Sequence, residues 1–276
     1  MKNFEHKVAV VTGAASGMGR SLAVQLTEAG ARVAISDVDA DGLKETARLC
    51  LEAGAEPRFD TLDVSDRTAV HAYADSVAAE FGTVNLVINN AGITIFGTVE
   101  ASPYEDIEKV MNVDFWGVVH GTKAFLPHLI ASGDGHVVNI SSVFGLFGYP
   151  TQSSYNAAKF AVRGFTESLR QEMLQSKQPV QVTCVHPGGI KTNIVNLASA
   201  SDGSDLTNLQ RSFQKMARTT ADEAATVILN GVKAGKPRVL IGADAHVFDV
   251  SVRVLGPAYQ RVFAAVSTLM MKRIEK

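Results

Sequence analysis

Cysteine is scarce in this chain of 276 residues, with only Cys50 and Cys184 present. Both lie in segments of apolar pattern, so we expect two reduced thiols in the core rather than a disulfide or a reactive thiol. The sequence also lacks a Cys-x-x-Cys pair, a mixed cysteine–histidine cluster and any histidine spacing typical of metal ligands. These absences disfavour a disulfide-bonded secreted scaffold and predict no metal site.

An excess of positive charge is lacking as well. There are 26 lysines and arginines against 28 aspartates and glutamates, a net charge of −2, and no basic block stands out. The composition therefore gives nucleic-acid binding no electrostatic support. The N-terminal residues lack the apolar region and cleavage site of a signal peptide. The charge-free run 135–158 carries too many polar groups to read as a lipid-spanning helix, so we expect a cytoplasmic protein.

Short runs of β-branched residues alternate with longer segments of helical period. Near-continuous apolar strands separated by helices indicate a parallel sheet covered on both faces. We therefore expect one α/β domain over 1–245, a doubly wound Rossmann-like sheet, followed by a C-terminal amphipathic extension over 246–276. Strands are expected at 7–12, 32–36, 56–60, 84–88, 135–141, 180–185 and 238–241, and helices at 17–29, 39–53, 66–81, 103–131, 153–177 and 221–234.

Local signals refine this outline at three places. Ser102 with Glu105, and Thr220 with Glu223, predict capping boxes at the starts of two helices. Residues 190–219 form a longer insertion. Its segment 198–208 is rich in serine, aspartate, asparagine and glycine, and we expect it to be a mobile loop.

A glycine-rich turn joins the first strand to the first helix. Gly13, Gly17 and Gly19 have the spacing Gly-x3-Gly-x-Gly, with Ser16 and Met18 between them. Glycines let the backbone turn tightly and approach a diphosphate, and the helix N-terminus offers free N–H groups and a positive dipole end. A purely structural turn is the alternative, but the position between strand and helix favours a phosphate site.

Asp37 follows the second strand, 18 residues after Gly19. This offset suits an acid that hydrogen-bonds the ribose hydroxyls of a dinucleotide. A carboxylate here would repel a 2′-phosphate, and no basic residue follows it or takes the place of Ser16. The pattern therefore favours NAD over NADP, and a helix-capping role for Asp37 is the alternative.

Ser142, Tyr155 and Lys159 form the most informative pattern in the chain. Tyr155 and Lys159 are four residues apart and share one face of the predicted helix. An ammonium group near a tyrosine favours the phenolate and lowers its pKa from about 10, which suits acid/base work. Ser142 ends the fifth strand, at the edge where open α/β sheets bind ligands. Its hydroxyl is a candidate to hold a substrate oxygen.

These motifs together resemble the short-chain dehydrogenase/reductase family over residues 5–245. Five motifs occur in the family's order, which makes coincidence a poor explanation. The matching residues are Thr12 to Gly19, Asp63-Val64, Asn89-Asn90-Ala91-Gly92, Asn112, Ser142, Tyr155-x3-Lys159, and Pro187-Gly188 with Thr192.

The resemblance implies a seven-stranded parallel sheet and a catalytic tetrad. Ser142 would orient and polarise the substrate oxygen, and Tyr155 would pass a proton to or from it. Lys159 would lower the pKa of Tyr155 and bind the nicotinamide ribose. Asn112 would help to hold a water that links Lys159 to solvent, although a role in a helix kink or on a solvated face is the alternative.

The resemblance also implies contacts with the cofactor. Asp63 and Val64 would contact adenine. Asn90 would lie near the adenine-side ribose and shape the central strand, with Ala91 and Gly92 beside it. For Asn89 and Asn90, a structural network that holds the sheet is the alternative to ligand contact. The segment from Pro187 through Gly188 to Thr192 would fix the nicotinamide carboxamide, with backbone contacts from Ile190. His186 replaces a frequent asparagine, and for it we expect a packing or loop hydrogen-bonding role.

Apolar side chains gather in the segments expected around the reacting centre. They predict an apolar pocket under a movable lid, which would suit a hydrophobic alcohol or ketone. For any single residue, packing in the core or against another subunit is the alternative. The cations Lys191 and Arg211 lie close to these segments, so a carboxylate or phosphate substrate is a further alternative. The residues are Ile93, Ile95, Phe96, Val143, Phe144, Leu146, Phe147, Tyr149, Ile194, Val195, Leu197, Leu206, Leu209, Phe213 and Met216.

The C-terminal extension carries an apolar stripe near helical spacing, with Pro257 expected to start a helix. We expect this stripe to pack on the body of the protein or on a neighbouring subunit. A peripheral membrane contact or a cap over the substrate pocket is the alternative. The stripe comprises Leu255, Tyr259, Val262, Phe263, Val266, Leu269, Met270 and Ile274, and Lys272, Arg273 and Lys276 close the chain.

The sequence thus predicts an NAD(H)-dependent oxidoreductase that interconverts a secondary alcohol and a ketone. A dinucleotide-binding sensor or scaffold without turnover is the alternative outside enzymes, and a dehydratase or epimerase on the same fold is the alternative within them. By the resemblance, a homodimer or homotetramer is expected, with the helices 103–131 and 153–177 at the interface.

Overall fold

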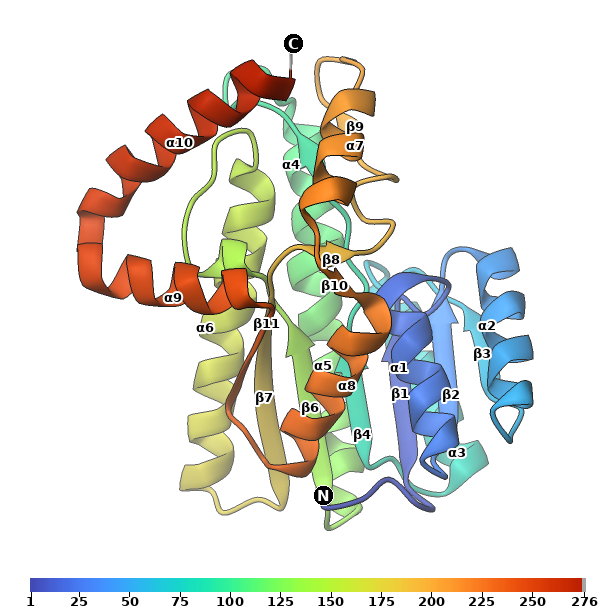
Figure 1. Ribbon diagram of the computed structural model, residues 1–276. Coiled ribbons are helices and arrows are strands. Elements are labelled where there is room, and N and C mark those ends of the chain that lie inside the picture. The colour runs from blue at the N-terminus through green and yellow to red at the C-terminus, as the bar shows by residue number, and fades with distance from the viewer. Residues whose placement is uncertain (275–276) are drawn as a thin grey trace.

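Seven parallel strands form one sheet through the centre of the molecule (Figure 1). The computed structural model describes the backbone of residues 1–274 and the side chains of residues 1–268. The strand order is β11-β7-β6-β4-β1-β2-β3, as expected for a doubly wound fold. The strands are β1 (Val8–Thr12), β2 (Arg32–Asp37), β3 (Arg58–Thr61), β4 (Leu86–Asn89), β6 (Gly135–Ile140), β7 (Val180–Pro187) and β11 (Arg238–Ile241).

The strand order reverses on the two sides of β1, which pairs with both β2 and β4. Val10 lies opposite Ala34 on one side and Val87 on the other. The carboxyl ends of β1 and β4 therefore meet at the switch point of the sheet, where ligands bind in this class of fold. The glycine turn follows β1, so the chain places it at this edge.

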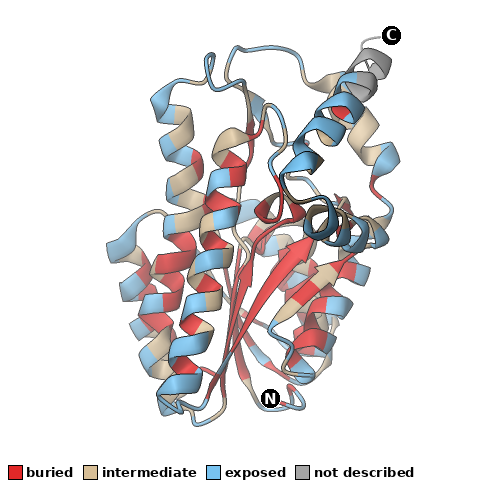
Figure 2. Cartoon of the chain, turned by 90° about the vertical axis from the view of Figure 1, so that its left-hand side faces the viewer, coloured by how far each residue is buried: buried red, intermediate tan, exposed pale blue. Residues whose placement is uncertain are grey.

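Helices cover both faces of the sheet, and the strands between them consist largely of buried residues (Figure 2). On one face Leu22, Leu43 and Ile228 join one apolar core, and on the other Val77 and Phe125 join a second. The first face carries α1 (Gly17–Glu28), α2 (Ala40–Glu52) and α8 (Ala221–Lys233), and the second carries α3 (Arg67–Phe81), α5 (Gly117–Ala131) and α6 (Ser153–Gln175).

The helix expected over 103–131 contains a change of pitch. It consists of α4 (Tyr104–Met111), a π-helical segment η1 (Asn112–Trp116) and α5. A π turn holds an extra residue, so it rotates the side chains that follow it relative to a continuous α-helix. This rotation decides which side chain of the segment reaches the interior.

The two predicted capping boxes had different outcomes. At the start of α8, the Thr220 hydroxyl accepts from the N–H of Glu223, and the Glu223 side chain accepts from the N–H of Thr220, as predicted. At α4 the prediction was wrong: Pro103 is the N-cap residue, with no side-chain cap. The Ser102 hydroxyl donates instead to the carbonyl oxygen of Thr98, 2.8 Å away, which stabilises the preceding turn.

The 190–219 insertion contains three short strands and a helix, α7, which the sequence analysis did not predict. The loop expected at 198–208 includes one of these strands and the start of the helix, and its mobility stays a prediction. Leu206, Leu209 and Phe213 fall at helical spacing, and this was the available signal. Its elements are β8 (Ile190–Lys191) with β10 (Thr219–Thr220), β9 (Ser199–Ala200) with β5 (Ile95–Phe96), and α7 (Thr207–Met216).

The C-terminal extension forms α9 (Ala243–Leu255), a short turn η3 (Gly256–Ala258) and α10 (Tyr259–Ile274), which arches toward α7 (Figure 1). The helix expected to begin at Pro257 therefore begins at Tyr259. Phe263 packs inward, whereas Val262 and Val266 are exposed. Predicted stripe residues 269, 270 and 274, with the cations 272 and 273, lie beyond the described side chains, and 276 beyond the described backbone.

Across the helices of residues 1–274, none combines the length and apolar character needed to cross a membrane.

Candidate active site

The glycine turn packs tightly against the segment that follows β4. A Cβ on Gly13, where φ is +66°, would lie 2.6 Å from the Cα of Ala91, and a Cβ on Gly19 would lie 2.1 Å from the carbonyl oxygen of Gly13. The Asn90 side-chain amide donates to the carbonyl oxygens of Thr12 and Gly13, at 2.9 and 3.0 Å. Asn90 therefore has a structural role, because it binds the turn itself, and the proximity to a ribose expected for it stays a prediction.

The N-terminus of α1 is left open beside Thr192. Ser16 is its N-cap residue, and its side chain makes no capping hydrogen bond. Gly17 has φ of +54°, and its added Cβ would lie 3.2 Å from the Cβ of Thr192. The structure thus brings Thr192 from the insertion to the glycine turn, while Met18 packs against the core beneath. Free N–H groups at this helix end suit a phosphate.

Asp37 lies at the carboxyl end of β2, with its carboxylate held by backbone donors. One oxygen accepts from the N–H of Ala15 at 2.9 Å, and the other from the N–H of Asp39 at 3.1 Å. The side chain is only half-buried, so lone pairs of its carboxylate remain available to a ligand.

Asp63 and Val64 follow β3 at the same edge of the sheet. Asp63 is exposed and accepts from the N–H of Ser65 at 2.9 Å. Val64 is buried against Gly117 at the start of α5, and its carbonyl oxygen lies 3.2 Å from Nδ1 of His120. The Asp63 side chain is thus free to meet a ligand, whereas Val64 could do so mainly through its backbone.

Ser142, Tyr155 and Lys159 come together where β6 ends and α6 begins. The Lys159 Nζ atom lies 5.4 Å from the centre of the Tyr155 ring. The Ser142 hydroxyl oxygen accepts from the N–H of Phe144 at 3.1 Å, which leaves its hydrogen to donate elsewhere. All three predicted side chains are buried next to one another.

Asp114 joins this group, and the sequence analysis missed it. Its carboxylate forms an ion pair of 3.0 Å with Nζ of Lys159, and the two side chains are 0% and 3% exposed. Its other oxygen accepts from the N–H of Ile93 at 2.8 Å. A Cβ on Gly92 would lie 3.1 Å from the Asp114 carboxylate and 3.3 Å from Nζ of Lys159, so Gly92 makes room for the pair.

Asn112 is not part of the group, and its expected place near Lys159 was wrong. The side chain of Asn112 is exposed. It precedes Asp114 by two positions, and residues two apart do not share a helix face, so only one of them can point inward. An acid between apolar residues, in the stretch Val113-Asp114-Phe115, was the signal that could have identified Asp114.

The ionisation of Tyr155 differs from the sequence-based expectation. Burial raises the pKa of Tyr155, and this outweighs the lowering by the Lys159 ammonium and by the contact with Ser142. The Asp114 carboxylate raises the pKa of Tyr155 further. Burial alone would lower the pKa of Lys159, but the Asp114 carboxylate and Tyr155 together raise that pKa overall, so the lysine stays charged.

The segment after β7 is anchored by a residue of helix α9. The N–H of Gly188 donates to the carbonyl oxygen of Ile241 at 2.9 Å, and the N–H of Gly189 donates to Asp244 at 2.7 Å. A Cβ on Gly188 would lie 2.3 Å from the Asp244 carboxylate. Ile190 is buried, next to this anchor. Asp244, in the first turn of α9, was not identified from the sequence.

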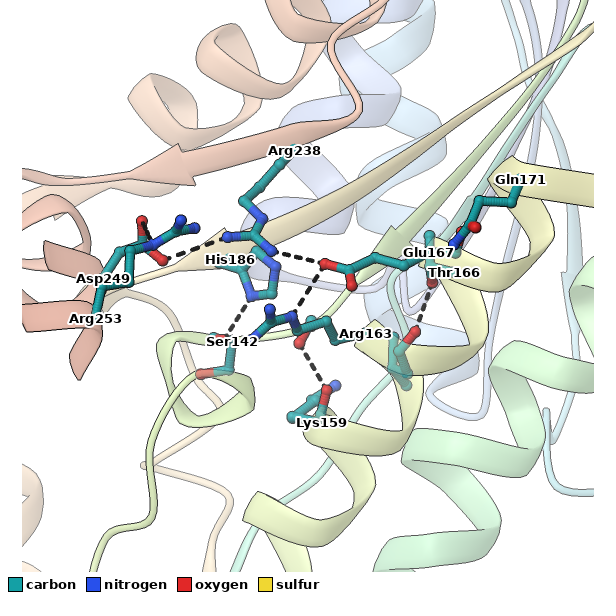
Figure 3. Close-up of polar contacts among 12 residues, drawn as sticks. Ser142, Lys159, Arg163, Thr166, Glu167, Gln171, His186, Arg238, Asp249 and Arg253 are labelled. Atoms are coloured by element: carbon teal, nitrogen blue, oxygen red, sulfur yellow. Dashed lines mark hydrogen bonds and ion pairs between the residues drawn. The ribbon is translucent and has the colours of Figure 1, made fainter. Parts of the chain in front are cut away.

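His186 supports the backbone at Ser142 (Figure 3). Its Nδ1 lies 2.9 Å from the carbonyl oxygen of Ser142, which can only accept, so Nδ1 carries the hydrogen. Burial lowers the pKa of His186 to about 4 and keeps the ring neutral. The loop hydrogen-bonding role expected for His186 is confirmed.

An apolar cluster surrounds Tyr155 in the first turn of α6. The Phe144 ring meets the Tyr155 ring edge-on at 6.2 Å and stacks on Tyr149 at 5.2 Å. Phe147 meets Phe144 edge-on at 5.4 Å and packs on Phe248 of α9 at 4.8 Å, so it links this cluster to α9. The other members of the cluster are Ile93, Ile95, Val110, Met111, Phe115, Ala158 and Ile194.

Other apolar residues expected to line the pocket lie elsewhere. Val143 and Leu146 belong with Phe147 to the core formed with α9 and α10. Leu197 and Met216 are 80% and 52% exposed.

These features fit a dinucleotide cofactor. The glycines leave no side chain over the open end of α1, so a diphosphate could approach the backbone there. The carboxylate of Asp37 ends the neighbouring strand, where the ribose hydroxyls of a dinucleotide would lie. Lys159 and Tyr155 lie farther along the same edge of the sheet, beyond β4, which places them toward the other end of such a molecule.

Comparisons with known proteins agree with this geometry. The sequence model for the short chain dehydrogenase family matches residues 7–202. The chain is 57% identical over 266 residues, 96% of each protein, to SadH of Mycobacterium tuberculosis (strain ATCC 25618 / H37Rv), which is provisionally named as an oxidoreductase.

Solved structures show the same similarity. A short chain dehydrogenase/reductase from Burkholderia phymatum in complex with NAD superposes with a TM-score of 0.80, at 30% identity, covering 87% of this chain and 90% of that one. An alcohol dehydrogenase from Thermococcus sibiricus, complexed with 5-hydroxy-NADP, gives a TM-score of 0.74 at 26% identity, covering 86% and 96%. This chain belongs to the short-chain dehydrogenase/reductase family of oxidoreductases.

Proposed function

We propose that the protein interconverts a secondary alcohol and a ketone on a hydrophobic substrate, with NAD(H) as its cofactor. The observation that carries the proposal is the convergence of Ser142, Tyr155 and Lys159 at the carboxyl edge of the sheet, next to the glycine turn. When bound, the nicotinamide supplies the group that takes or gives the hydride. The protein supplies the position of the substrate and the path of the proton.

Ser142 and Tyr155 act on the substrate oxygen. The Ser142 oxygen already accepts from the N–H of Phe144, so its hydrogen is free to donate to that oxygen and hold it. Tyr155 takes the hydroxyl proton during alcohol oxidation and returns it during ketone reduction. Lys159 keeps a positive charge beside the ring and stabilises the phenolate in the step that needs it.

The preference for NAD rests on Asp37. Its carboxylate, oriented by the N–H groups of Ala15 and Asp39, hydrogen-bonds the adenine-side ribose hydroxyls and repels a 2′-phosphate. Arg20, which follows Gly19 in α1, is already engaged with the hydroxyl of Thr46 and a backbone carbonyl, so it does not offset this repulsion. Structural neighbours of the family bind NAD or an NADP derivative, so the choice is decided by this local charge.

The apolar character of the substrate rests on the cluster at Tyr155. Phe144, Ile95 and Ile194 reach the ring from three separate segments. An apolar molecule next to the reacting oxygen would keep water out and strengthen the electrostatic interactions of the site.

The direct test is a screen for NADH or NADPH formation over a panel of hydrophobic secondary alcohols, each run with NAD and with NADP. We expect turnover with NAD on bulky apolar alcohols. Cofactor binding without reduction on any alcohol would overturn the proposal and favour a dinucleotide sensor. Product formation without net change in NADH would favour a dehydratase or epimerase.

A further inference from the structure

A buried carboxylate pairs with the lysine of the site. Asp114 and Lys159 are joined across 3.0 Å in the interior, and Nζ of Lys159 also donates to the carbonyl oxygen of Ile140 at 3.2 Å. The π-helical segment η1 turns Asp114 inward and leaves Asn112 outside. The positive charge of Lys159, which lies beside Tyr155, is therefore paired with the negative charge of Asp114.

We propose that Asp114 is a positioning residue that raises the pH range over which Tyr155 changes between acid and base. This inference rests on the function proposed above. Asp114 acts through Lys159, which it holds by the ion pair, and through its own negative charge behind the lysine. With Asp114 ionised, the pair is neutral as a whole, so it favours the phenolate less than a lone ammonium would.

Among the residues that the structure describes around the pair, no other charge compensates for Asp114. On β7, burial raises the pKa of the Cys184 thiol to about 12, and burial lowers the pKa of His186 to about 4, so both are neutral. Arg163, one turn beyond Lys159 on α6, is paired with Glu167 at 3.0 Å. The packed segments 90–94 and 143–145 bring no titratable side chain. The balance at Tyr155 is thus set by Lys159 against Asp114.

The replacement Asp114→Asn separates charge from shape. An asparagine oxygen can still accept from the N–H of Ile93, which the carboxylate does at 2.8 Å. The variant therefore keeps the local hydrogen bond while removing the negative charge. Lys159 keeps two supports for its charge in this variant, the Tyr155 phenolate as it forms and the carbonyl oxygen of Ile140, 3.2 Å from Nζ. Tyr155 then meets an ammonium that no carboxylate offsets, and we expect its ionisation to move to lower pH.

The first measurement uses the protein without cofactor, so it does not depend on turnover. The absorbance of tyrosinate is titrated with pH, and the Tyr155 signal is obtained as the difference from the same protein carrying Tyr155→Phe. We expect Asp114→Asn and Asp114→Ser to lower the midpoint of this difference by about one pH unit or more. Asp114→Glu, which keeps the charge, should stay closer to the wild type.

Glu108→Gln is the matched control, because Glu108 is an exposed acid of the adjoining helix α4. It should leave the Tyr155 midpoint unchanged. An unchanged or higher midpoint in both neutral variants would overturn the proposal, as would an equal shift in Glu108→Gln.

The second measurement is the pH profile of kcat for alcohol oxidation. We expect its acid limb to move down by a similar amount in Asp114→Asn while KM for the alcohol changes little. A purely structural role would lower kcat equally at every pH and leave the limb in place, which would contradict the proposal. Failure of the proposed function is distinct, because wild-type protein would then show no oxidation although the cofactor-free titration still shifts.

Discussion

The tight glycine turn can be tested by two glycine-to-alanine changes that share a helical setting. Gly19 lies in α1 and Gly164 in α6. On helix propensity alone, each change should stabilise the fold by up to about 1 kcal/mol. A Cβ on Gly164 meets no atom within 4 Å, whereas a Cβ on Gly19 would lie 2.1 Å from the carbonyl oxygen of Gly13 and 2.7 Å from Nδ2 of Asn90.

The atoms that Gly19→Ala would displace have little freedom to move. The Gly13 carbonyl is backbone, and it accepts from Nδ2 of Asn90 at 3.0 Å. Overpacking a well-packed site costs about 1–3 kcal/mol. We therefore expect Gly19→Ala to lower the free energy of unfolding by about 1–3 kcal/mol and Gly164→Ala to raise it by up to about 1 kcal/mol.

Urea unfolding gives both values, from midpoints compared at unchanged slope. Titration with NAD gives the second readout: Gly19→Ala should also weaken cofactor binding, because the turn that meets the diphosphate is forced open, while Gly164→Ala should not. Equal stabilisation by the two alanines, with cofactor affinity unchanged, would refute the assigned close approach.

Two further predictions concern Asp37 and His186. Asp37→Asn keeps an acceptor for the N–H of Ala15 but loses the charge, so the kcat/KM ratio of NAD over NADP should fall by about tenfold or more; an unchanged ratio would contradict the ribose assignment. Because the pKa of His186 falls to about 4 in the folded protein, against about 6.5 unfolded, the unfolded state binds the proton first as the pH drops. Stability should therefore decline by about 3 kcal/mol from this residue between pH 6.5 and pH 4. Urea unfolding of His186→Asn, which can still donate to the carbonyl of Ser142, should show a smaller decline; an identical decline would assign the loss to other groups.

The sheet was predictable because its signal is periodic. Runs such as 8–11 are apolar at every position, which only a strand buried on both faces requires, and the helices between them have their own period. The glycine turn, Ser142, Tyr155 and Lys159 were predictable for a similar reason, since their positions follow from where β1 and β6 end. Because parallel strands end at the same edge of the sheet, these residues are then brought close together in space.

What the sequence did not reveal depends on contacts that no local pattern encodes. Asn112 and Asp114 are both polar residues in one helical stretch, and only the π turn decides that Asp114 faces Lys159. The pKa of Tyr155 was expected to be lowered by Lys159 alone, because burial and the charge of Asp114 are properties of the packed site. Asp244 reaches Gly189 from a helix 55 positions later, which spacing cannot predict.

The C-terminal extension illustrates the same limit. Its stripe predicts an amphipathic helix, but not which surface that helix covers. The structure shows Phe263 and Tyr259 packed on Phe147, at 5.0 and 6.4 Å, and the Tyr259 hydroxyl accepting from the N–H of Gly148. The extension therefore supports the segment that carries Phe144 to Tyr155. Contacts of its exposed valines with a second subunit or a membrane stay predictions.

The most direct test of the account is the rate of NADH formation by Tyr155→Phe on an alcohol that the wild type oxidises. The change removes one oxygen and leaves the ring among its apolar neighbours, so we expect NAD binding to be retained and kcat to fall by about a hundredfold or more. Tyr104→Phe, at a tyrosine that is 80% exposed, should leave both unchanged. If Tyr155→Phe bound NAD and oxidised the alcohol at the wild-type rate, the phenol would not be the acid/base of this site.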